Sequence, residues 1–140
     1  MKIKRKKIFN IKINNDNSYQ EVIQETLKYC LKLGFKKKYS NECAIISAEL
    51  ATNIIKYASF GEITLNKITK GKEKGIEIIA KDKGPGIENT ELALQQGYST
   101  GKSLGIGLPG VKRMVDEFVI KSILNKGTTV KIIKWEKSNH

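Results

Sequence analysis

The sequence predicts an α+β fold in which helices cover one face of a mixed or mostly antiparallel β-sheet. The first observation behind this prediction is the order of segments, which is a strand, two helices, two strands, two helices and two strands. The second observation is size, since 140 residues, 39% of them hydrophobic, suffice to bury a core without disulfides. Because no repeat or linker interrupts the chain, we expect residues 1–140 to form a single domain.

The N-terminal segment, residues 1–14, reads as a basic strand with one covered face. Ile3, Ile8, Ile11 and Ile13 alternate in part with lysines and other polar residues. Lysines along a strand discourage edge-to-edge pairing, so we expect this strand to lie at an edge of the sheet.

Two helices follow the first strand. A capping-box pattern at residues 18–21 predicts the start of the first helix, and Gly34 predicts its end. The second helix is expected to begin near Ser40 and to break at residues 59–61. Its apolar residues recur every three or four positions, and they are Cys43, Ile46, Leu50, Ile54 and Tyr57. This spacing predicts that Cys43, and likewise Cys30, is a small core residue and not a reactive thiol.

The second half of the chain predicts two hairpins separated by two helices. In chain order these are strands at 63–69 and 75–80 around a turn at 71–74, helices at 90–95 and 108–117, and strands at 118–124 and 128–135 around a turn at 125–127. Pro109 falls in the first turn of its helix, where a missing N–H is tolerated.

The formal net charge of +12 raises the question of a nucleic-acid partner. All the basic residues except Arg5 and Arg113 are lysines, and they are scattered along the chain. Recognition of bases and phosphates relies mainly on the bidentate fork of arginine, and the few aromatic residues are not interleaved with basic clusters. Nucleic acid is therefore not the expected partner.

Several other classes of protein are excluded by what the sequence lacks. The only histidine is His140 and the two cysteines do not have metal-ligand spacing, which excludes a zinc site and a Ser-His-Asp triad. No apolar run approaches the length of a membrane span, and no apolar signal core follows the basic N-terminus. We therefore expect a cytoplasmic protein without a membrane partner.

The first pattern that points to chemistry is the pair Glu49 and Asn53 on the second predicted helix. Residues four apart share one helix face, and this face is offset from the apolar stripe. A carboxylate can orient or deprotonate a nucleophile, and an amide oxygen one turn away can bind a hard cation such as Mg²⁺. The alternative is an ordinary solvated helix face.

The second pattern is the segment DKGPGI at residues 82–87, directly after a predicted strand. An acid at a strand end, here Asp82, can accept a hydrogen bond from an exocyclic amine. Gly84 and Gly86 allow the backbone to approach a flat ring closely. The alternative is a plain turn.

The third pattern is the glycine-rich run at residues 97–110, which contains a literal G-x-G-x-x-G. The context excludes a dinucleotide-binding fold, because that motif belongs directly after a strand in a βαβ unit. Backbone N–H groups at the following helix start would suit phosphates, and Lys102 could add a point charge. A flexible surface loop is the alternative.

Together with residues 127–129 at the start of the last strand, these motifs occur in the order and approximate spacing of the Bergerat ATP-binding fold. The chain resembles the GHKL ATPase family along nearly its whole length, which implies an α/β sandwich with a mixed sheet and helices on one face. The resemblance implies ATP and Mg²⁺ as cofactors. Glu49 would be the catalytic base or its orienter, and Asn53 would be the Mg²⁺ ligand.

The same resemblance assigns the remaining site residues. Asp82 would bind the adenine amine with Thr128 assisting through water, and Gly84 and Gly86 would make room for the base. Residues 97–107 would close over the phosphates. The other residues implied to contact the cofactor are Ile87, Lys102, Gly105, Ile106, Gly107 and Leu108.

The branch of the family is narrowed by what the chain lacks. It has neither a phosphoacceptor histidine with a dimerisation helix pair nor room for a transducer domain. Residues 48–54, 82–87, 97–100 and 105–118 look like the switch-protein serine kinases of the bacterial stressosome. This implies an ATP-dependent serine/threonine kinase that phosphorylates STAS-domain proteins, either a stressosome scaffold or an anti-sigma antagonist. When released, it would activate a PP2C-type phosphatase.

Two other functions remain open at this point. One is an anti-sigma factor of the same fold, which would sequester a sigma factor. The other is a nucleotide-gated binding module that transfers no phosphate.

Overall fold

The computed structural model describes residues 1–58, 60–86 and 107–137. Its elements in chain order are β1 (Lys4–Ile13), α1 (Asp16–Lys32), α2 (Lys37–Tyr57), β2 (Gly61–Lys70), β3 (Glu73–Asp82), α4 (Gly107–Met114), β4 (Glu117–Ile123) and β5 (Gly127–Trp135). These elements match the predicted order, and the predicted helix at 90–95 lies outside the described residues. The α+β prediction is confirmed.

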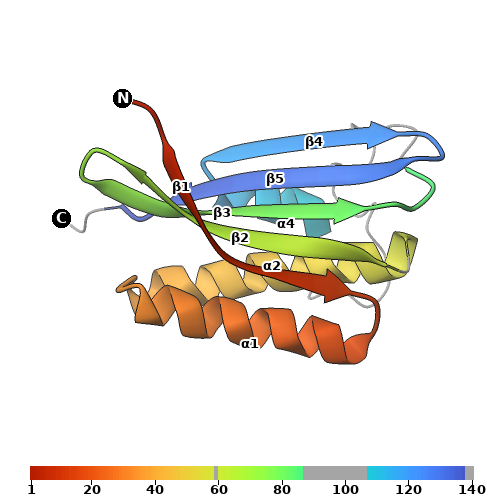
Figure 1. Cartoon of the computed structure of the whole chain (residues 1–140), viewed down its shortest axis with the longest axis horizontal. Coiled ribbons are helices and arrows are strands. Elements are labelled where there is room, and N and C mark those ends of the chain that lie inside the picture. The colour runs from red at the N-terminus through yellow and green to blue at the C-terminus, as the bar shows by residue number, and fades with distance from the viewer. Residues whose placement is uncertain (59, 87–106, 138–140) are drawn as a thin grey trace.

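The five strands form one sheet in the order β1-β2-β3-β5-β4 (Figure 1). Each neighbouring pair in this sheet is antiparallel, so the described strands match the mostly antiparallel form of the prediction. β1 lies at one edge, as its lysines predicted. The turn between β2 and β3 is shorter than expected, because Lys70 still pairs with Glu73 and the left-handed φ of Gly71 (61°) allows a tight reversal.

The helices cover one face of the sheet, here called the helix face, while the other is called the second face (Figure 1). Ile63 and Leu65 of β2 and Ile76 and Ile78 of β3 lie on the helix face and are fully buried. Alternate residues on the same strands therefore point to the second face.

Both cysteines are core residues, as predicted. Cys30 and Cys43 are 0% exposed and unbridged. The hydrogen bond with Cys30 and burial raise the pKa of the Cys43 thiol well above its ordinary value. The thiol therefore stays protonated and unreactive at neutral pH.

The start of α1 differs from the prediction. The N-cap is Asn15, whose side chain accepts a hydrogen bond from the Ser18 N–H at 2.9 Å, while the Ser18 hydroxyl accepts one from the Asn15 N–H at 3.1 Å. Ser18 thus occupies the third helical position, and the capping box predicted at 18–21 was wrong by one turn. Asparagine is as good an N-cap as serine, and the serine hydroxyl supplies the reciprocal bond.

A β-bulge lies in β1 between Lys7 and Phe9. It inserts one residue into the alternation, so Arg5 falls on the second face while Ile11 and Ile13 lie on the helix face. On the second face Arg5 donates hydrogen bonds from Nε and one terminal nitrogen to the buried Glu77 carboxylate at 2.9 to 3.1 Å. The Asn66 amide donates a further bond to the same carboxylate at 2.9 Å.

None of the helices that the structure describes is long and apolar enough to cross a membrane.

Candidate functional site

The sequence motifs converge at one end of the sheet, where α2 and β3 end and where β2 and β5 begin (Figure 1, right). A side chain at Gly127, the first residue of β5, would lie 2.1 Å from the carbonyl oxygen of Asp82. The start of β5 is therefore packed directly against the end of β3. Two motifs that lie far apart in the sequence meet here through close backbone contact.

Asp82 is held in place through one carboxylate oxygen. Its Oδ1 accepts hydrogen bonds from the backbone N–H groups of Gly84 at 2.9 Å and Thr128 at 3.1 Å. No described residue donates a hydrogen bond to Oδ2, and the side chain is half-buried. The carboxylate is thus oriented by the fold and keeps one acceptor atom for another donor.

The loop after Asp82 packs against both the end of α2 and the end of β4. A Cβ at Gly84 would lie 2.6 Å from the Cβ of Ala58 at the end of α2. Gly86 has a φ of 81°, and a Cβ there would lie 2.5 Å from the carbonyl oxygen of Ile123. Close packing within the protein therefore requires both glycines, and their predicted role in making room for a base stays a prediction.

Glu49 and Asn53 lie one turn apart on α2, and Glu49 is completely buried. The solvated-face alternative is therefore wrong for Glu49. Ile54, the residue after Asn53, contacts Gly61, the first residue of β2. A Cβ built on Gly61 would lie 2.9 Å from the Ile54 side chain and 3.1 Å from the Cα of Asp82. The last turns of α2 thus lie beside the end of β3.

The Asn53 side chain carries an unmet hydrogen-bonding group. Its Nδ2 is buried and has no hydrogen-bond partner among the described residues. An unsatisfied buried amide costs on the order of 1–3 kcal/mol, which a bound ligand could recover. A reorientation of the amide would present the oxygen in place of the nitrogen, so the group fits either a donor or an acceptor role.

Gly107 and Leu108 open α4, which packs against α2. Gly107 has a left-handed φ of 58°, and the Leu108 side chain is buried in the core. The Leu108 side chain is therefore part of the core, and at these two residues only the backbone could contact a ligand. The other predicted residues of the glycine-rich run, which are Lys102, Gly105 and Ile106, lie outside the described residues, as do Ile87 and the predicted lid as far as residue 106.

Sequence reasoning missed one residue next to the site. The Ser122 hydroxyl lies 2.8 Å from the Thr128 hydroxyl, in a register that pairs β4 with β5. Thr128 is buried, so this contact orients the hydroxyl that the resemblance assigns to the site. Counting outward from the 125–127 turn could have found the pair, because hairpin register follows turn position.

Comparison with known proteins gives the site a family context. Residues 40–138 match the family model described as "Histidine kinase-, DNA gyrase B-, and HSP90-like ATPase". The chain is 41% identical over 104 residues to the "Serine/threonine-protein kinase RsbT" of Bacillus subtilis, which covers 74% of this chain and 78% of that protein.

Proteins named "Anti-sigma F factor" also match. The one from Thermoanaerobacter sp. is 32% identical over 63% of this chain and 64% of its own length. That of Anoxybacillus flavithermus is 32% identical over 66% of this chain and 67% of its own length. All the residues described above from α2 onward at the site fall within the segment that matches the family model.

Proposed function

The chain belongs to the histidine kinase-, DNA gyrase B- and HSP90-like ATPase family, and from this membership we propose that it is an ATP-dependent serine/threonine protein kinase of a partner-switching stress pathway. Membership implies that the chain binds ATP. The observation that carries the proposal is the Asp82 carboxylate, held through Oδ1 with Oδ2 left for a donor, at the sheet end where α2 brings Asn53. The identity of 41% to a named serine/threonine kinase supports transfer of phosphate to protein.

In the proposal, the adenine ring lies beside the end of β3. Asp82 Oδ2 accepts a hydrogen bond from the exocyclic amine, and Thr128 assists through a water molecule. Gly84 and Gly86 make room for the base, and Ile87 is assigned to the cofactor-binding residues. Ser122 keeps the Thr128 hydroxyl oriented, which is consistent with their 2.8 Å contact.

The phosphates and Mg²⁺ are assigned to α2 and to the segment before α4. Asn53 binds the metal, and the unmet amide of this residue supports that role. No group of three or more His, Cys, Asp or Glu residues in the described part of the chain could hold a metal, so phosphate oxygens would complete the coordination. Lys102 and the backbone N–H groups of residues 105–108 contact the phosphates.

Glu49 performs the proton chemistry. When bound, Mg-ATP supplies the γ-phosphoryl group and the metal charge that neutralises the phosphate oxygens. The Glu49 carboxylate accepts the proton of the attacking serine or threonine hydroxyl, or orients that hydroxyl. Its complete burial keeps bulk water from competing for this position.

The partners follow from the proposed reaction. The names of the relatives imply partner-switching regulators. We assign STAS-domain proteins as substrates and a PP2C-type phosphatase as the protein activated after release. We assign this reaction to the cytoplasm, where ATP is available.

An anti-sigma factor is the second candidate, and the matches to proteins named anti-sigma F factor favour it. The test is capture of a partner from lysate, followed by incubation with Mg-ATP and mass spectrometry. A serine or threonine phosphate on the captured protein supports the kinase. Capture of a sigma factor without any phosphate transfer would favour the second candidate.

A further inference from the structure

The outer edge of β1 is available for another strand. β1 pairs with β2 along its full length and has no second strand partner in the described sheet. Half of its backbone N–H and C=O groups therefore point away from the sheet. Figure 1 shows this strand at the margin of the sheet, with α1 lying next to it.

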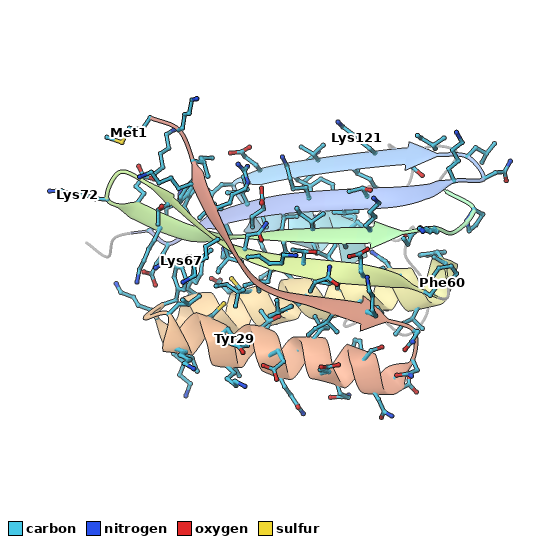
Figure 2. All side chains as sticks on the ribbon, in the orientation of Figure 1. Met1, Tyr29, Phe60, Lys67, Lys72 and Lys121 are labelled. Atoms are coloured by element: carbon cyan, nitrogen blue, oxygen red, sulfur yellow. The ribbon has the colours of Figure 1, made fainter. Side chains whose placement is uncertain are left out.

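Six lysines, five exposed and one (Lys67) half-buried, surround the first half of this edge. We call the basic edge the set Lys4, Lys6 and Lys7 of β1, Lys67 and Lys70 of β2, and Lys72 in the turn after β2. None of the six lies within 4.0 Å of a carboxylate of a described residue, although Lys12, Lys74 and Lys134 do. Figure 2 shows Lys67 and Lys72 at the same end of the sheet as the start of β1.

The basic edge brings like charges together. Lys6 pairs directly with Lys67 across the two strands. Like charges at directly opposite positions destabilise a sheet, and no described acid offsets this pair. The arrangement therefore favours a ligand that brings negative charge.

The lysines of β1 point to both faces of the sheet. Lys6 shares the helix face with Lys67, whereas Lys7 pairs with Asn66 on the second face. Arg5 also points to the second face, but its guanidinium is already bound to Glu77. The free cations at this edge are thus lysines that alternate above and below the strand.

We propose that the basic edge binds an extended acidic segment of a partner protein, which adds to the sheet as a strand beside β1. An added strand alternates its own side chains between the two faces, so consecutive acids would meet Lys6 on one face and Lys7 on the other. Lysines lack the planar fork with which arginine recognises phosphates and bases, so this edge favours a peptide over a nucleic acid. A second copy of β1 would place lysines against lysines.

This site is separate from the proposed nucleotide site. Lys4 pairs with Thr69 near one end of β2, whereas Asp82 pairs with Gly61 at the other end. These positions on β2 are about 26 Å apart at about 3.3 Å per residue. The inference therefore does not depend on the kinase assignment, and both ligands could bind together.

Binding is tested with the full chain and a fluorescent peptide that carries consecutive glutamates flanked by threonine and valine. The variant Lys4→Glu/Lys6→Glu/Lys7→Glu reverses the three charges on β1. Its matched control is Lys36→Glu/Lys37→Glu/Lys38→Glu, which makes the same net change at three exposed lysines at the start of α2. Amide hydrogen exchange on the wild type, with and without peptide, reports strand addition directly.

The expected result is binding at low salt that the β1 variant weakens by about tenfold or more, while the control variant changes it little. Alternate amides of β1 should exchange more slowly with peptide present. Equal losses in both variants, or tighter binding of a single-stranded oligonucleotide of equal charge, would replace the proposal with general electrostatic attraction. Absence of peptide binding, or protection of β1 by self-association alone, would overturn it.

Discussion

At the residue scale, Glu77 is a carboxylate that is 1% exposed in the middle of an apolar strand. Burial opposes its ionisation, but the hydrogen bonds from Arg5 and Asn66 outweigh burial and hold the pKa of Glu77 below its ordinary value. The hydrogen bond with Glu77 and the charge of Glu77 also raise the pKa of Arg5. The ion pair ties the edge strand β1 to β3 across β2.

Without the Arg5 guanidinium, the buried Glu77 carboxylate should destabilise the folded protein. We expect Arg5→Met to lower the free energy of unfolding at pH 7 by about 2 kcal/mol. Since the folded pKa of Glu77 is depressed, this stabilisation exists above the ordinary value of about 4.3 and is lost as pH falls through the folded value. Urea unfolding at neutral and acidic pH should show the difference between variant and wild type shrinking with acidification. If the difference in unfolding free energy between variant and wild type were the same at both pH values, the stabilising role of the Arg5–Glu77 ion pair would be contradicted.

Asp82 offers a second test at this scale. Asp82→Asn keeps an oxygen that can accept the bonds from Gly84 and Thr128, but it replaces Oδ2 with a donor. The variant should fold normally and lose most of the rise in melting temperature that Mg-ATP gives the wild type. Glu62→Gln, the same chemical change on the second face, should keep the full rise. A variant of Asp82 that Mg-ATP stabilises as well as the wild type would argue against adenine recognition here.

At the element scale, the two possible caps of α1 make different predictions. The structure assigns the N-cap to Asn15, whereas the sequence pattern at 18–21 pairs Ser18 with Glu21. We expect Asn15→Ala to destabilise the protein by about 1 kcal/mol, because it removes the acceptor for the Ser18 N–H. Glu21→Ala should have little effect. Thermal unfolding of both variants decides between the two caps. A larger loss of stability in Glu21→Ala than in Asn15→Ala would favour the capping box predicted at residues 18–21.

The elements also show where sequence reasoning ends. The strands at 63–69 and 75–80 were predicted from two β-rich runs, and the structure extends the first by three residues and the second by four. In the N-terminal strand, the alternation carried back from Ile11 and Ile13 would turn Arg5 toward the helices. The bulge alone turns Arg5 to the second face, and no local sequence pattern predicts a bulge in this strand. The ion pair between Arg5 and Glu77, which are 72 positions apart, could therefore not be predicted from the sequence.

At the scale of the whole molecule, the fold separates two kinds of surface. Asp82, Thr128 and the last turns of α2 meet at one end of the sheet, and the basic edge lies toward the other. The motifs predicted that the first group belongs together, because the Bergerat fold fixes their order. The sequence could not reveal that Oδ1 of Asp82 is already used by Gly84 and Thr128, since that depends on the contact between β3 and β5.

The central claim is that this end of the sheet transfers phosphate, with Asn53 holding the metal and Glu49 acting on the hydroxyl. Glu49→Gln keeps the shape of the side chain and removes its basicity, while Asn53→Ala removes the metal ligand. The two losses should therefore differ in kind.

The most direct test pairs two measurements on the wild type and both variants: Mg-ATP affinity by calorimetry, and phosphorylation of the captured partner by mass spectrometry. We predict that Glu49→Gln binds Mg-ATP nearly as well as the wild type and transfers phosphate about 100-fold more slowly. Asn53→Ala should lose both Mg-ATP binding and transfer. Undiminished transfer by Glu49→Gln would contradict the account.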